Sequence, residues 1–170
     1  MNENIESDGN NKSGENNEKK IILKIKKREN NNTFSLDKDI NSQLKYVNML
    51  YCNEAFNNDK KIKSEINQKI NSYKNQDIKK KREHGLITYD ELIEKLVVSK
   101  LKCYYCKTDV SIIYENVRQK NQWTLERIDN KISHTNDNCV ICCLECNLKR
   151  RCIDSNRFKY SKDFFNIKKI

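Results

Sequence analysis

Two pairs of cysteines with the same spacing stand out in the second half of the chain. The first pair is Cys103-Tyr-Tyr-Cys106, and the second is Cys143-Leu-Glu-Cys146. Two residues between cysteines let a tight turn present both sulfur atoms to one ion, and two such pairs supply the four thiolates of a tetrahedral zinc site. Buried cysteines also serve as small apolar side chains, but that role does not explain two spaced pairs. The sequence therefore predicts a structural Zn²⁺ site.

A third CxxC motif, Cys139-Val-Ile-Cys142, leaves two registers open for the second half of this site. If residues 139–142 form a strand, successive side chains alternate between its faces, so Cys139 and Cys142 point in opposite directions. The next pair falls where a strand would give way to a helix, which suits a zinc knuckle. We therefore expect the zinc ligands to be Cys103, Cys106, Cys143 and Cys146. The remaining cysteines have other expected places: Cys139 and Cys142 in the core, and Cys52 and Cys152 without a metal role.

Polar side chains that suit a hard cation lie between and just after the cysteine pairs. Glu126 falls in the β-rich run WTLERI, and Asn147 directly follows the last cysteine. A strand–turn–strand–helix order would place this carboxylate opposite the amide on the helix. Mg²⁺ and Mn²⁺ take oxygen ligands of this kind and keep water molecules for substrate. A surface salt bridge between Glu126 and a basic neighbour is the plainer alternative.

Taken together, the segments CYYC, QWTLERIDN, the Ser-His turn, DN and CLECNLKRR resemble the HNH (ββα-metal) endonucleases. They are similar above all to the zinc-clipped, endonuclease VII-like branch and to HNH proteins of large DNA viruses and phages. The resemblance covers Leu101–Cys152 and does not reach residues 1–70. It implies a metal-dependent DNA endonuclease that hydrolyses phosphodiester bonds. The implied fold is a small ββα-metal core clipped by the four-cysteine zinc site.

The resemblance also implies roles by position. Glu126 takes the place of the metal-binding acid, and Asn147 that of the second ligand of a catalytic Mg²⁺ or Mn²⁺. Asn138 takes the place of the central Asn, which in the family braces the loop that holds the catalytic base. The ion would bind a phosphate oxygen and the leaving oxygen, and so stabilise charge that develops in the transition state. For Asn138, the plainer alternative is a turn-capping residue.

One position departs from the family pattern. Arg127 stands where the general base is usually His, and a guanidinium with a pKa above about 12 cannot take a proton from water near neutral pH. Arg127 can instead clamp a phosphate through two hydrogen bonds. The expected base is then His134, in the turn between the strands, because imidazole titrates near neutral pH. Asp129 and metal-bound water are the other candidates, and an exposed turn histidine is the plainer interpretation of His134.

Basic residues are in excess and gather in two runs. The chain carries 34 Lys and Arg against 24 Asp and Glu, a formal net charge of +10, which indicates a polyanionic partner. AT-biased coding is a second source of the Lys excess. Phosphate contacts of this kind give affinity without sequence choice. Beside a phosphodiesterase motif, we expect DNA contacts from Lys79, Lys80, Lys81, Arg82, Lys149, Arg150 and Arg151.

A second class of function fits many of the same residues. A zinc-ribbon-like nucleic-acid-binding module with weak or no catalytic activity would use the same cysteines and basic runs. Arg127 in place of His favours this hypothesis. A nuclease fold that has lost activity and serves as an interaction protein is the third. A pure binding module has no need of Glu126 opposite Asn147, so this pair separates the first two hypotheses.

The elements that must hold these residues predict an α+β protein. Residues 1–33 are rich in Asn, Glu, Lys and Ser, and predict a disordered tail. Apolar residues at three- and four-residue steps predict two helices within 34–84, a helical extension for DNA binding or dimerisation. Residues 85–170 form the predicted endonuclease domain, which opens with helix 89–101 behind the capping box Thr88-Tyr-Asp-Glu91. Short β-rich runs at 110–114, 123–128 and 139–142 and a helix over 144–151 follow.

The cellular location and the oligomeric state of the protein can also be predicted. No run of about 18–20 apolar residues is present, which excludes a transmembrane span, and the N-terminus lacks the apolar core of a secretory signal. We therefore expect an intracellular, reducing compartment (cytoplasm, nucleus or a viral replication site), where paired cysteines bind metal sooner than form disulfides. Cutting both DNA strands needs two active sites, so a homodimer formed through the helices of 36–73 is a further prediction.

Overall fold

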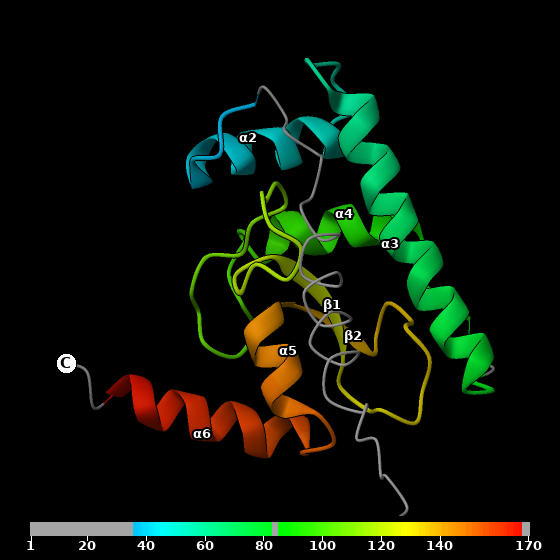
Figure 1. Cartoon of the computed structure of the whole chain (residues 1–170), viewed down its shortest axis with the longest axis vertical. Helices are drawn as coiled ribbons and strands as arrows, with labels where there is room; N and C mark the ends of the chain where they lie inside the picture. The colour runs from blue at the N-terminus through cyan, green and yellow to red at the C-terminus, as the bar shows by residue number, and fades with distance from the viewer. Residues whose placement is uncertain (1–35, 83–84, 168–170) are drawn as a thin grey trace, which may run out of the picture.

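Figure 1 shows the computed structural model, which describes residues 36–82 and 85–167, with side chains to residue 164. Within these residues five helices accompany one two-stranded sheet, so the predicted α+β class is confirmed. The predicted disordered tail, residues 1–33, lies outside the described residues. The elements are α2 (Ile40–Tyr51), α3 (Asp59–Lys79), α4 (Tyr89–Val98), β1 (Trp123–Arg127), β2 (Cys139–Cys143), α5 (Leu144–Arg150) and α6 (Ser155–Ile167).

Helices α2 and α3 supply the predicted helical extension, and both pack on α4. Along α3 the four-residue repeat of Ile62, Ile66 and Ile70 is buried, as its spacing predicts. The same hydrophobic core continues from Val47 in α2 to Ile141 in β2. The extension and the hairpin therefore share one core, which fixes the position of α3 relative to the sheet.

Helix α4 begins at the predicted capping box. The Thr88 hydroxyl accepts a hydrogen bond from the Glu91 amide at 3.3 Å, and the Glu91 carboxylate accepts one from the Thr88 amide at 2.8 Å. The helix ends at Val98, earlier than the predicted residue 101. Lys100 and Leu101 adopt left-handed conformations with φ of 50° and 51°, which turn the chain toward the first cysteine pair. The predicted helix is thus too long at its C-terminal end.

Strands β1 and β2 form an antiparallel hairpin, and α5 follows β2 without a linker. The register pairs Trp123 with Cys143 and Arg127 with Cys139. α5 packs on both strands and α4 on β2, so the hairpin lies between these two helices (Figure 1). Four of the five β1 residues are buried because both faces of the strand are covered. The ββα order that the sequence predicts is therefore present.

The predicted β-rich run at 110–114 does not form a regular strand. Only an isolated bridge between Ser111 and Gln122 is present there. The amides of Ile112 and Ile113 donate to the side-chain oxygen of Gln43 in α2, at 2.8 and 3.0 Å. A buried glutamine (1% exposed) thus takes the hydrogen bonds that a neighbouring strand would otherwise accept.

Helix α6 packs against Tyr105, which lies within the first cysteine pair. The Tyr105 hydroxyl hydrogen-bonds to the Ser155 hydroxyl at 3.1 Å. The rings of Tyr105 and Phe158 meet edge to face, with centroids 5.0 Å apart. These contacts hold the helix against the segment that carries Cys103 and Cys106. Within residues 36–82 and 85–167, no helix is both long and apolar enough to cross a membrane.

Candidate zinc clip and nucleic-acid site

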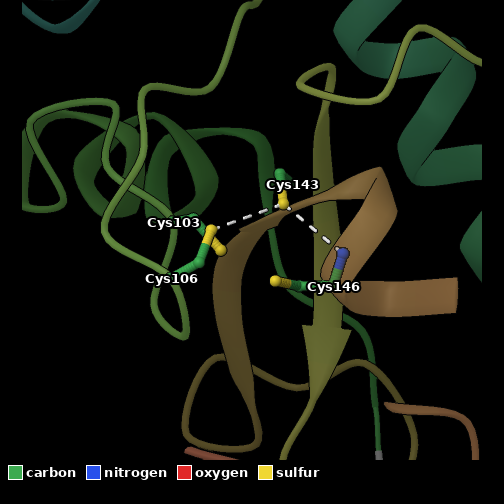
Figure 2. A group of neighbouring side chains, drawn as sticks. All are labelled: Cys103, Cys106, Cys143 and Cys146. Carbon is green, nitrogen blue, oxygen red and sulfur yellow. Dashed lines mark hydrogen bonds between the residues drawn. The ribbon is translucent and has the colours of Figure 1, made fainter. Parts of the chain in front are cut away.

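The four predicted zinc ligands converge. The sulfur atoms of Cys103, Cys106, Cys143 and Cys146 all lie within 4.8 Å of one another (Figure 2). The Sγ atoms of Cys106 and Cys143 are 3.8 Å apart. Tetrahedral zinc with Zn–S bonds of about 2.3 Å requires sulfur separations of about 3.8 Å. The geometry and the donor chemistry therefore fit a zinc ion held by four thiolates.

Local backbone structure presents each pair. The amide of Lys107 donates to Cys103 O at 3.0 Å, closing the turn that holds the first pair. Cys143 is the N-cap of α5, and its Sγ accepts a hydrogen bond from the Cys146 amide at 3.4 Å. The amide of Tyr104 donates to Ile141 O at 2.9 Å and joins the two halves of the clip. The second pair thus lies at the strand-to-helix junction, as predicted.

The alternative register is excluded by the positions of the other two cysteines. Cys142 points away from the cluster, and its Sγ lies 3.2 Å from the hydroxyl of Thr124 on β1. Burial raises the pKa of the Cys139 thiol to about 12 and that of Cys142 well above its usual value. Neither sulfur belongs to the group of four that lies within 4.8 Å. Their predicted place in the core is confirmed.

Replacing neighbouring cysteines tests this register. Cys143→Ser is expected to abolish stoichiometric zinc binding, because it removes a thiolate from the clip. Cys142→Ser is the matched control, since the adjacent thiol faces Thr124, and it should retain zinc. Zinc content is measured on purified protein by atomic absorption. Loss of zinc from Cys142→Ser with retention in Cys143→Ser would overturn the assignment.

Two residues of α5 after the second cysteine pair face β1. Asn147 donates from its amide to the Thr124 hydroxyl at 3.3 Å, and Arg150 binds Glu126. Residues three apart on a helix and two apart on a strand each share one face, so these two contacts lie side by side. Asn147 therefore lies opposite Thr124, and Arg150 takes the place opposite Glu126 that the sequence prediction gave to Asn147.

The predicted catalytic cation does not fit this arrangement. The Glu126 carboxylate forms an ion pair with Arg150, whose side chain is 2% exposed. Burial raises the pKa of Glu126, while the hydrogen bond and charge of Arg150 act in the opposite direction. A carboxylate already neutralised by a guanidinium is a poor ligand for Mg²⁺ or Mn²⁺. The prediction that Arg150 contacts DNA is also wrong, because the side chain is buried.

His134, the predicted base, is buried rather than exposed in its turn. Its Nδ1 lies 2.8 Å from Asp77 Oδ2, and its backbone amide donates to the same oxygen at 2.8 Å. The Tyr73 ring packs on the imidazole, with centroids 4.7 Å apart. Burial lowers the pKa of His134, although Asp77 acts against this shift. A neutral imidazole with Nδ1–H donated to Asp77 leaves Nε2 to accept a proton.

Asp77 was not among the predicted site residues. Burial alone would raise its pKa, but hydrogen bonds from the amide and ring of His134 hold it below its ordinary value. Asp77 lies on α3, far from the HNH-like segment in sequence. The detectable signal was its position four residues after Tyr73, where it continues the buried face of α3. A carboxylate on an otherwise apolar helix face indicates a buried partner.

Two guanidinium groups share the same carboxylate. Arg82 Nη1 lies 3.3 Å and Arg127 Nη1 lies 3.5 Å from Asp77 Oδ1. Arg82 also donates from Nε to Asn130 O at 3.0 Å. Nη1 of Arg127 is buried and has no hydrogen-bond partner among the described residues. One carboxylate thus faces two arginines and an imidazole, and this excess of donors suits an anion such as phosphate.

Asn138 braces the loop between the strands. Its side-chain oxygen accepts from the Asp129 amide at 2.9 Å, and its amide donates to Asp129 O and Ser133 O, both at 3.0 Å. The loop so held includes His134. Asp129, the alternative base, is exposed, and its carboxylate accepts from the Lys131 amide at 2.8 Å. The structure thus brings together Asn138, His134 and Arg127, with Asp129 at the surface.

The predicted DNA contacts divide by exposure. Lys79, Lys80 and Lys81 are exposed at the end of α3, next to the Arg82–Asp77 pair. On α5 and after it, Lys149 and Arg151 are also exposed, and Lys149 pairs with Glu145 at 2.7 Å. Arg82 is half-buried and Arg150 is buried. The exposed lysines and Arg151 remain candidates for phosphate contact.

Comparisons with known proteins identify no relative. No family model, curated protein or solved structure matches this chain. The likeness to HNH endonucleases therefore depends on the residues quoted above and on the ββα order. What is shown directly is an α+β fold with four cysteines placed to hold a metal ion such as zinc.

Proposed function

We propose that this protein is a DNA endonuclease of the HNH type, in which His134 is the general base. One observation carries the proposal: Asp77 orients His134 beside the guanidinium groups of Arg82 and Arg127. A base must hold a lone pair near neutral pH and be fixed in orientation, and the Asp77–His134 pair meets both conditions. Phosphodiester hydrolysis also needs cations beside the base, and the arginines supply them.

In the proposed reaction, Nε2 of His134 removes a proton from the attacking water as its oxygen bonds to phosphorus. The P–O bond to the leaving 3′ oxygen breaks, and a solvent water protonates that oxygen. Asp77 holds the imidazole through Nδ1–H and stabilises the imidazolium that forms. Arg127, whose guanidinium is held by its ion pair with Asp77, lies beside the phosphate and compensates charge that grows in the transition state. Zinc, when bound, has a structural role in the clip, because four thiolates leave no open coordination position for substrate. No step requires an ion at Glu126.

The exposed lysines after α3 supply DNA affinity in this proposal. The double variant Lys80→Gln, Lys81→Gln is expected to weaken binding to duplex DNA and to reduce the slope of log K against log salt by about two, roughly one per lost phosphate contact. Lys45→Gln, Lys60→Gln is the matched control, since both lysines are exposed on other parts of the helical extension. Fluorescence anisotropy at several salt concentrations measures both. Equal slopes for the two variants would place the DNA elsewhere.

Plasmid nicking tests the proposed activity. Zinc-loaded protein is incubated with supercoiled plasmid without added divalent ion, with Mg²⁺ and with Mn²⁺. The proposal expects nicked circles, at a rate that Arg127→Gln reduces by roughly 10²-fold or more. Arg127→Gln purified in parallel also controls for contaminating nuclease. Linear, nicked and four-way substrates then define which DNA is cut.

A second candidate is DNA binding without cleavage. The ion pair of Glu126 with Arg150 favours it, because this pair fills the position that the HNH resemblance assigns to the catalytic ion. If the protein binds duplex DNA but nicks no plasmid under any of the three ion conditions, the endonuclease proposal fails. The binding function then stands.

A further inference from the structure

Four oxygen atoms converge on the guanidinium of Arg150. Nη1 donates to the Glu126 carboxylate, to Arg127 O at 2.8 Å and to Asn130 Oδ1 at 3.2 Å. Nη2 donates to Ile128 O at 2.7 Å. The oxygens are thus one carboxylate, one side-chain amide and two main-chain carbonyls, all from the end of β1 and the loop after it. This set, which we call the oxygen cradle, has the composition of a binding site for a hard cation.

Burial makes a cation necessary in the oxygen cradle. The side chains of Arg150 and Glu126 are 2% and 9% exposed. A buried carboxylate without a counter-charge is strongly destabilising, and unpaired carbonyls add to the penalty. Nη1 carries two hydrogens but faces three oxygens, while Nε of Arg150 has no partner among the described residues. Arg150 therefore stabilises the cradle mainly through its positive charge, because its hydrogen bonds are incomplete.

The helix register explains how Arg150 reaches the cradle. Asn147, which the HNH resemblance assigns to the catalytic ion, lies one turn earlier on the same face of α5. Its amide nitrogen turns to the Thr124 hydroxyl. The next side chain along that face is Arg150, which lies over Glu126. A single helix face thus presents an amide donor and then a guanidinium to β1. Neither group can coordinate a metal ion together with Glu126.

We propose that the guanidinium of Arg150 is the resident cation of the oxygen cradle, and that the protein binds no divalent ion at Glu126. The cation that HNH nucleases take from solution is supplied here by the chain itself. This inference does not depend on nuclease activity, because it concerns which cation occupies the cradle. It holds equally for a protein that cleaves DNA and for one that only binds it.

Direct measurement of Mn²⁺ binding tests the proposal on the unmodified protein. Zinc-loaded wild type is titrated with Mn²⁺, and free Mn²⁺ is followed by its paramagnetic resonance signal. No stoichiometric Mn²⁺ site that depends on Glu126 is expected, so wild type and Glu126→Gln should give the same titration. A stoichiometric site in the wild type that Glu126→Gln abolishes would overturn the proposal, because the ion would then have displaced Arg150. This result is independent of plasmid nicking.

Chemical rescue tests the role of the guanidinium itself. Arg150→Ala is expected to lower the thermal midpoint by on the order of 10 °C, as loss of one partner of a buried ion pair does. Millimolar methylguanidinium should raise this midpoint by filling the cradle, but not those of wild type or Arg151→Ala, the matched exposed neighbour. Arg150→Lys replaces Arg150→Ala if the latter does not fold. A midpoint of Arg150→Ala equal to that of Arg151→Ala would contradict the proposal.

Discussion

Removal of zinc is expected to unfold the β1–β2–α5 unit. Structural zinc sites contribute on the order of 10 kcal/mol of binding free energy, which equals the whole stability of many domains. Here the clip joins the segment after α4 to the start of α5. The main-chain hydrogen bond from the Tyr104 amide to Ile141 O joins the same segment to β2. Without the ion, the four cysteine sulfurs, which lie within 4.8 Å of one another, are no longer joined through a metal.

Thermal unfolding with and without a zinc chelator measures this effect. The zinc-loaded protein should melt at a markedly higher temperature than the chelated protein, and added Zn²⁺ should restore the midpoint. Cys106→Ser should melt like the chelated protein and ignore added zinc. Cys52→Ser and Cys152→Ser are the controls, because both thiols are exposed and lie outside the cluster. A chelator that leaves the midpoint of wild type unchanged would contradict a structural zinc site.

The zinc ligands were predictable because their constraint is local. Two-residue spacing restricts which cysteines share an ion, and the alternation of a strand separates Cys142 from Cys143. The capping box of α4 was predictable for the same reason, since its donors and acceptors lie within one turn of the helix. The bracing contacts of Asn138, which the HNH resemblance implied, are also formed within a single loop.

Residues paired over long distances could not be assigned from the sequence. Within the run Lys149-Arg150-Arg151, nothing local distinguishes the buried arginine from its exposed neighbours. The distinction arises from the register of α5 on β1, which places one of the three over Glu126. Asp77 reaches His134 only because the shared core fixes α3 beside the loop of the hairpin. The sequence therefore predicts the metal-binding knuckle better than the surrounding charge network.

Replacement of His134 is expected to have the largest effect on activity. His134→Gln keeps most of the side-chain volume against Tyr73 but removes the base, so the nicking rate should fall by roughly 10²-fold or more while DNA affinity is retained. Asp129→Asn is the matched control, because it replaces the rival base at the surface and preserves the hydrogen bond to the Lys131 amide. A large loss in Asp129→Asn with none in His134→Gln would transfer the role to Asp129.

The pH profile separates a base from a structural histidine. Burial lowers the pKa of His134 below its ordinary value of 6.5, so the neutral, active form should predominate above that value. Activity should then be lost only as the pH falls through the lowered pKa, below 6.5. Asp77→Asn removes the charge that raises the pKa of His134, so its acid limb should move to still lower pH, with a reduced maximum rate. A purely structural Asp77 would lower the amount of folded protein without moving the acid limb of the active fraction.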